Sequence, residues 1–173
     1  MVVTSLIYAL GDISGAHINP AVTIAFWLAK RFPGKQIFPY IVSQLVGALF
    51  ASLVVYFLFM NHETLGATVP QGSTLQSFLL EVILTFILML VILNVSTGAK
   101  EKGLMAGVAI GGVVCLEALF AGPISGASMN PARSIGPSLI SGQWQQLWVY
   151  IFAPTIGACI AVFSCQLLRK ECC

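Results

Sequence analysis

The chain has 173 residues, of which 58% are hydrophobic and only 8% are charged, with a formal net charge of +2. Soluble domains are about one quarter charged, so a chain this poor in charge could not cover a folded surface in water, and an ordinary soluble domain is excluded. The small net charge, with no extended basic patch, also disfavours nucleic acid as a partner.

Four apolar stretches are long enough to cross a lipid bilayer, which takes roughly 20 helical residues. In chain order they are residues 36–60, 75–95, 103–121 and 143–168. The chain also opens on an apolar piece, residues 1–10, that is too short to cross. The sequence therefore predicts an integral membrane protein with four full spans and one partial span.

Two short stretches repeat one pattern: residues 14–20 read SGAHINP and residues 125–131 read SGASMNP. The apolar runs that follow, residues 21–29 and 132–140, reach only halfway across a bilayer at about 1.5 Å per residue. Proline suits the first position of a helix, because its missing N–H would have no partner there. We therefore expect two re-entrant half-helices.

Basic residues supply the expected orientation. Apart from Arg133, they flank alternate ends of the predicted spans: Lys30, Arg31, Lys35, Lys100, Lys102, Arg169 and Lys170. Threading the spans through the intervening loops brings all of these residues to one face, which the positive-inside rule makes cytoplasmic. The C-terminus is accordingly expected in the cytoplasm.

The repeat extends beyond the two loops, because QLVGALFA at 44–51 aligns with PTIGACIA at 154–161. Three predicted crossings separate the two loops, so the second must enter the membrane from the opposite face. Such an inverted repeat places interrupted helices back to back at the bilayer midplane. We expect one domain over residues 1–173, with a partial first repeat at 1–60 and a second repeat at 75–168.

The chemistry of the two loops follows from their backbone. Non-helical backbone is tolerated at membrane depth only where it lines a cavity or is buried in protein. Ser-Gly-Ala keeps the side chains small, so the carbonyls can serve as a ladder of acceptors. Asn19 and Asn130 each precede a half-helix, where asparagine is a good cap and the helix dipole is positive. Two such ends meeting mid-membrane predict a pair of donors in a field that repels cations and protons.

SGAHINPAVT and SGASMNPARS resemble the two signature loops of the aquaporin and aquaglyceroporin (major intrinsic protein) family, and the likeness covers nearly the whole chain. The resemblance implies an all-α membrane channel with six spans and two Asn-Pro-Ala half-helices, assembled as a homotetramer without a cofactor. The family's first span has no counterpart here. That truncation is expected to leave the first repeat incomplete.

The resemblance also implies site residues, which fall into four groups. The pore motifs are Asn19, Pro20, Ala21, Asn130, Pro131 and Ala132. The carbonyl ladders are Gly15, Ala16, His17, Ile18, Gly126, Ala127, Ser128 and Met129. The selectivity filter contains Arg133, Ala118 and Ala127. Glu81 supports the second loop by accepting hydrogen bonds from its backbone. Neither a metal site nor an enzymatic activity is implied.

The filter residues bear on the solute. Water-selective relatives usually carry histidine where this chain has Ala118, so two alanines leave a wider and less polar ring. The stretch FAGPISGASMNPARSIGPS is most similar to nodulin-type plant channels and their bacterial relatives. That likeness implies passage of water and small uncharged solutes such as glycerol, urea, ammonia, or boric and silicic acid. Ser134 departs from the aspartate that is typical of glycerol facilitators.

Three readings stay open at this point. The chain is a channel, or it is a non-transporting form that serves as a structural or tetramer-regulating membrane subunit. A membrane enzyme is disfavoured, because no nucleophile–base pair or metal-binding cluster accompanies the two loops. His17 has two readings as well: it contributes to the cytoplasmic half of the pore, or it is packed between helices. Glu117 receives no role from the sequence.

Overall fold

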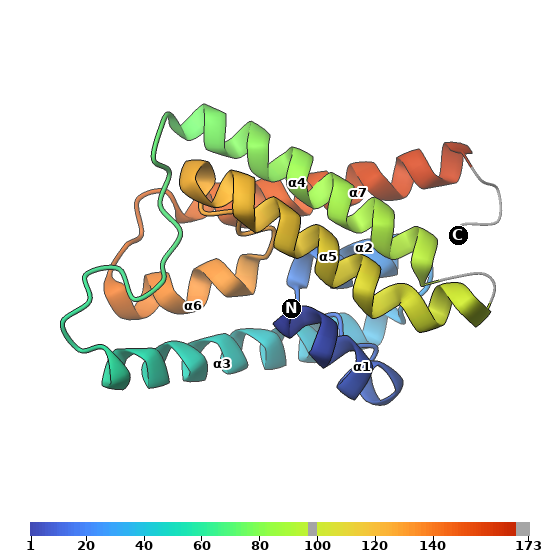
Figure 1. Cartoon of the computed structure of the whole chain (residues 1–173), viewed down its shortest axis with the longest axis horizontal. Helices are drawn as coiled ribbons and strands as arrows, with labels where there is room; N and C mark the ends of the chain where they lie inside the picture. Colours follow the sequence, from blue (N-terminus) through green and yellow to red (C-terminus); the bar gives the residue numbers. More distant parts are fainter. Residues whose placement is uncertain (97–99, 169–173) are drawn as a thin grey trace.

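The computed structural model describes residues 1–96 and 100–168, and of residues 100–103 it describes the backbone alone. The described residues form seven helices joined by loops (Figure 1). In chain order they are α1 (Val2–Ser14), α2 (Pro20–Leu28), α3 (Gly34–Leu58), α4 (Thr74–Val95), α5 (Lys100–Ser125), α6 (Pro131–Ser141) and α7 (Leu147–Leu168). The side chains of Lys100, Lys102, Arg169 and Lys170, on which the expected orientation partly rests, lie outside the description.

The four predicted spans are confirmed as the helices that are long and apolar enough to cross a membrane. They are Gly34–Leu58, Thr74–Val95, Leu104–Ser125 and Leu147–Leu168, while Val2–Ser14 is apolar but shorter. Their outward faces carry large apolar side chains, such as Phe50 at 69% exposed and Phe163 at 55% exposed. A surface of this kind is stable in hydrocarbon and not in water. The chain is thus an all-α, multi-pass membrane protein.

Two helices end later than the sequence analysis placed them. The prediction closed the first apolar piece at residue 10 and the third span at residue 121, next to Gly11 and Gly122. Both helices continue for one more turn, to Ser14 and Ser125. Each stops at the following glycine, whose positive φ and backbone N–H close the helix: Gly15 (φ 78) donates to Gly11 and Gly126 (φ 86) donates to Gly122. A left-handed glycine is a stronger stop signal than a glycine that keeps helical geometry.

The two short helices α2 and α6 begin at the predicted prolines and meet near the middle of the molecule (Figure 1). Around them, α4 crosses α7 so closely that a Cβ added at Gly157 would lie 2.3 Å from the Val82 carbonyl oxygen. Likewise α6 crosses α3 at Gly136, where an added Cβ would lie 2.7 Å from the Ala48 oxygen. These glycines allow backbones to approach, as is common for helices packed in membranes.

Candidate functional site

Asn19 and Asn130 cap the two short helices in the same way. Each has an extended backbone, with φ −156° and −153° respectively, and each places its side-chain oxygen over the first turn of the helix that follows. The Asn19 Oδ1 accepts from the Ala21 N–H at 2.9 Å, and the Asn130 Oδ1 accepts from the Ala132 N–H at 3.0 Å. The caps satisfy amide groups that a helix start otherwise leaves without partners.

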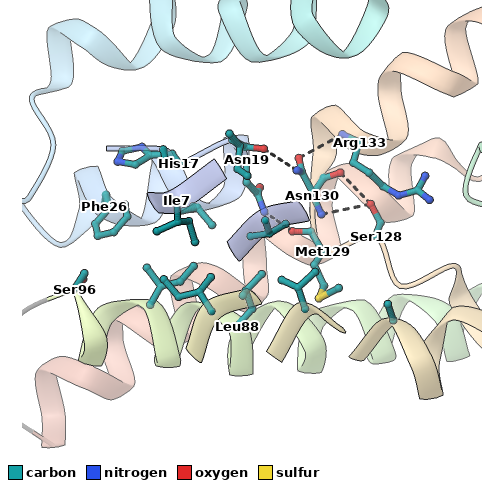
Figure 2. Close-up of a pocket in the computed structure, with 18 of the residues that line it drawn as sticks. Ile7, His17, Asn19, Phe26, Leu88, Ser96, Ser128, Met129, Asn130 and Arg133 are labelled. Carbon is teal, nitrogen blue, oxygen red and sulfur yellow. Dashed lines mark hydrogen bonds between the residues drawn. The ribbon is translucent and has the colours of Figure 1, made fainter. Parts of the chain in front are cut away.

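The two asparagines also bind each other's loop. The Asn19 Nδ2 donates to the Met129 carbonyl at 2.7 Å, and the Asn130 Nδ2 donates to the Ile18 carbonyl at 2.8 Å. An asparagine amide carries two N–H donors, so each side chain keeps one donor after this exchange. Figure 2 shows the two amides side by side at the centre of a cavity. The centre thus offers two fixed donors beside two positive helix ends.

A cavity of about 410 Å³ runs past this pair. Its lining includes every residue of the two predicted ladders: Gly15, Ala16, His17, Ile18, Gly126, Ala127, Ser128 and Met129. The opposite wall is apolar and comes from three helices: Ile7 of α1, Leu88 and Ile92 of α4, and Ile110 and Val114 of α5. Because one wall is polar and the other is apolar, the hydrogen-bonding groups that line the cavity come mainly from the loops and the asparagines.

The two loops share an unusual backbone path. Positive φ angles occur at equivalent positions of both: Ala16 (46°) matches Ala127 (42°), and Ile18 (42°) matches Met129 (53°). Left-handed backbone costs roughly 1–2 kcal/mol for a residue with a side chain. Such strain persists only where the surroundings hold it in place. Surrounding hydrogen bonds must therefore enforce the shape of both loops.

Glu81 of α4 supplies that support for the second loop. Its side chain is 0% exposed, and its carboxylate accepts from the backbone N–H groups of Ser128 and Met129 and from the Ser125 hydroxyl, each at 2.8 Å. The Tyr150 hydroxyl of α7 adds a bond of 2.6 Å to the Ser125 carbonyl. Glu81 was predicted in this role from the family resemblance, whereas Tyr150 was not. The sequence signal for Tyr150 was a hydroxyl group inside an apolar span, because a buried hydroxyl requires a hydrogen-bond partner.

Arg133 lies at one end of the cavity, beyond Asn130 (Figure 2). Its Nη1 donates to the Gly66 carbonyl, in the loop between α3 and α4, at 2.6 Å. Ala118 and Ala127 also line the cavity, so the three residues proposed for the filter share one chamber. Both alanines present only a methyl group, which leaves the guanidinium as the main polar group at this end. Gly66 could not be found from the sequence, because its part is played by a carbonyl oxygen.

His17 and Phe26 lie at the other end of the cavity (Figure 2). The His17 ring stacks on Phe26, with the centroids 4.7 Å apart, and packs edge-on or tilted against Phe32 and Tyr40 at 4.9 Å each. Its Nδ1 lies 3.2 Å from the Thr23 hydroxyl. The two readings of His17 are therefore compatible: the ring is packed among aromatic side chains, and it also borders the cavity.

Glu117 is not among the residues that line the cavity. Its side chain is 2% exposed, and neither carboxylate oxygen has a hydrogen-bond partner among the described residues. It thus makes none of the loop contacts that its neighbour in space, Glu81, makes. The structure assigns no part in the site to this residue.

Comparison with known proteins gives concordant results. The profile of the Major intrinsic protein family matches residues 1–164. The chain is 46% identical to Nodulin-26 of Glycine max over 98% of this chain and 63% of that protein. It is also 46% identical to Aquaporin NIP1-1 of Zea mays, over 98% of this chain and 60% of that protein. The chain therefore spans about 60% of the length of these curated relatives.

One solved structure that superposes is the X-ray structure of the aquaglyceroporin from Plasmodium falciparum, with a TM-score of 0.79 and 26% sequence identity. The superposition covers 94% of this chain and 76% of that one. The helix arrangement, with two half-helices meeting at their N-termini, is thus shared with that protein.

Proposed function

Because the chain belongs to the major intrinsic protein family, we propose that it forms a passive membrane channel for water and small uncharged solutes. The observation that carries the proposal is the pair of asparagines at mid-cavity. Each is fixed by its cap and by the opposite loop, and each keeps one N–H donor for a passing molecule. A water or hydroxyl oxygen accepts from these donors in turn as it moves along the carbonyls of the loops.

Exclusion of ions and protons follows from the same groups in this proposal. A cation that reaches the centre meets two helix N-termini and two N–H donors, all of which carry partial positive charge and repel it. The apolar wall offers no oxygen atoms that could replace the hydration shell of the cation. Arg133 adds a positive charge at one end of the cavity. A neutral solute suffers neither penalty and needs only to fit the chamber.

The solute range that we propose comes from the chamber beside Arg133. Ala118 and Ala127 leave room for molecules larger than water, and the wall opposite the carbonyls suits carbon-bound hydrogens. Glycerol, urea, ammonia and boric or silicic acid are small and uncharged, and present the donors and acceptors that the loops require. The similarity to Nodulin-26 and Aquaporin NIP1-1, and to the aquaglyceroporin with the shared fold, supports this range.

The proposal includes an assembly and an orientation. The apolar outer faces, such as that of α3, suit lipid and neighbouring copies in a homotetramer whose pores lie within the protomers. The distribution of basic residues along the sequence supports a cytoplasmic C-terminus by the positive-inside rule. The chain is one domain made of two inverted repeats, with Glu81 as the support of the second loop.

Osmotic stopped-flow on proteoliposomes tests the proposal. Vesicles that contain the chain should change volume faster than empty vesicles under gradients of an impermeant osmolyte, glycerol or boric acid. If all three gradients give the rate of empty vesicles, transport by this chain is refuted. A structural or tetramer-regulating subunit then becomes the better account of the same fold.

A further inference from the structure

A chain of buried hydroxyl groups runs behind the second half-helix. The Thr68 hydroxyl bonds to Ser134 at 2.7 Å, Ser134 bonds to Ser128 at 2.6 Å, and Ser128 donates to the Asn130 carbonyl at 2.9 Å. Thr68, Ser128 and Ser134 are at most 5% exposed. The bond between Thr68 and Ser134 was not expected from the sequence, because the two residues lie 66 positions apart.

The direction of every bond in this chain can be assigned. A carbonyl only accepts, so the single proton of Ser128 is used on Asn130. Ser134 must then donate to Ser128, and it must accept from Thr68. Thr68 is therefore the first donor in a series of three hydrogen bonds that all point the same way and end at the backbone carbonyl of Asn130.

The first half-helix has an equivalent network. The Thr23 hydroxyl donates to the Asn19 carbonyl at 3.0 Å and accepts from the Gln44 Nε2 at 3.0 Å. With its proton used on Asn19, Thr23 must also accept from the Nδ1–H of His17. In the two repeats Thr23 matches Ser134, four positions after the asparagine. Gln44 of α3 thus occupies the place that Thr68 has in the second network.

We propose that Gln44 and Thr68 are positioning residues for the two mid-cavity asparagines: each supplies the outermost donor of the network that fixes one of them. The inference rests on the proposed function, because it concerns how the channel's centre is held. Both donors come from α3 and the loop that follows it, so one segment sets the two halves of the centre. Neither side chain lines the cavity.

Thr68 has a second consequence through its loop. Gly66, whose carbonyl holds Arg133, lies two positions earlier, at a left-handed turn with φ 49° at Leu65 and 83° at Gly66. The methyl group of Thr68 packs on the second SGA loop, where a Cβ added at Gly126 would lie 3.0 Å from it. Loss of the Thr68 hydroxyl should therefore release both the Asn130 network and the carbonyl that fixes Arg133.

The first test compares permeabilities in the same vesicles. Thr68→Val keeps the shape of the side chain and removes the donor, so the ratio of glycerol to water permeability should rise about fivefold, the factor expected for one lost hydrogen bond. Thr68→Ser should restore the wild-type ratio. The matched control is Thr64→Val in the same loop, since the Thr64 hydroxyl makes no hydrogen bond among the described residues. A variant that only folds less well lowers both permeabilities and leaves the ratio unchanged, and that result overturns the inference.

A second test does not depend on transport. In Thr68→Val, amide hydrogen exchange of residues 130–134 should be about fivefold faster, while residues 19–23 keep the wild-type rate. In Gln44→Met, amide exchange should be faster in residues 19–23 and unchanged in residues 130–134. Equal exchange in both segments of both variants overturns the inference even if the wild-type chain does not transport. Absence of transport with the expected exchange pattern refutes the proposed function alone.

Discussion

At the scale of single residues, most of the site consists of hydrogen bonds whose donors can be counted. The side-chain amides of Asn19 and Asn130 each donate one N–H to a carbonyl of the opposite loop, and their oxygens cap the helices that follow them. What remains for a solute is one donor from each asparagine. Arg133 differs, because its guanidinium has five N–H groups and, among the described residues, its one side-chain hydrogen bond is that of Nη1 to the Gly66 carbonyl.

Arg133 supports a prediction about selectivity. Replacing it with alanine removes the main polar group beside Ala118 and Ala127 and enlarges the chamber. Urea and glycerol permeability should rise by about tenfold relative to water, the effect of roughly 1.4 kcal/mol on a barrier. Stopped-flow measurements with separate urea and glycerol gradients provide the ratio.

Arg133→Lys is the companion variant for this prediction. It keeps the charge but loses the planar fork, so it should fall between the wild type and alanine. Identical ratios in all three proteins would remove Arg133 from the filter.

At the scale of elements, the half-helices were predictable and their supports were only partly so. Proline at the first position, a length that reaches halfway across a bilayer and a repeated SGA loop are local signals, and α2 and α6 begin where these signals place them. Glu81 could be named from a family resemblance. Tyr150, Gly66 and Thr68 could not, because each reaches the loops through tertiary contacts that no local pattern encodes.

Helix ends show the same limit. The predicted apolar stretches ended just before Gly11 and Gly122, whereas the helices end at the left-handed glycines Gly15 and Gly126, one turn later. Sequence alone does not distinguish a glycine in helical geometry from one with positive φ, because glycine has no Cβ and adopts both conformations readily. Packing decides which of two glycines closes the helix.

Close crossings of helices give a prediction about stability. Gly157→Ala should destabilise the protein by about 2–3 kcal/mol or more. The new Cβ would collide with backbone atoms of Val82, which cannot move aside as the end of a flexible side chain can. Gly112→Ala is the control: no heavy atom lies within 4 Å of a Cβ added at Gly112, so α5 should gain about 0.5–1 kcal/mol from helix propensity. Thermal unfolding in detergent measures both. Equal melting temperatures for the two variants would contradict the close crossing of α4 and α7.

At the scale of the whole molecule, the described residues form four long helices and one shorter helix around two half-helices whose N-termini meet (Figure 1). The centre is rigid because each asparagine is tied to the opposite half, so neither loop can move without breaking a bond in the other. The outer faces are apolar and suit lipid. Such an arrangement lines a cavity with two asparagine donors and the residues of both SGA loops inside an apolar molecule.

Blocking the cavity with a large side chain is the most direct test of the proposed channel. Ala118 faces the cavity, whereas the next residue, Leu119, is 73% exposed on the outer surface. Ala118→Trp should fill the chamber, and Leu119→Trp should leave it open. We expect osmotic water permeability well above that of empty vesicles for the wild type and Leu119→Trp, and a rate close to that of empty vesicles for Ala118→Trp. Wild-type permeability in Ala118→Trp, or none in the wild type, would contradict a conducting pore at this site.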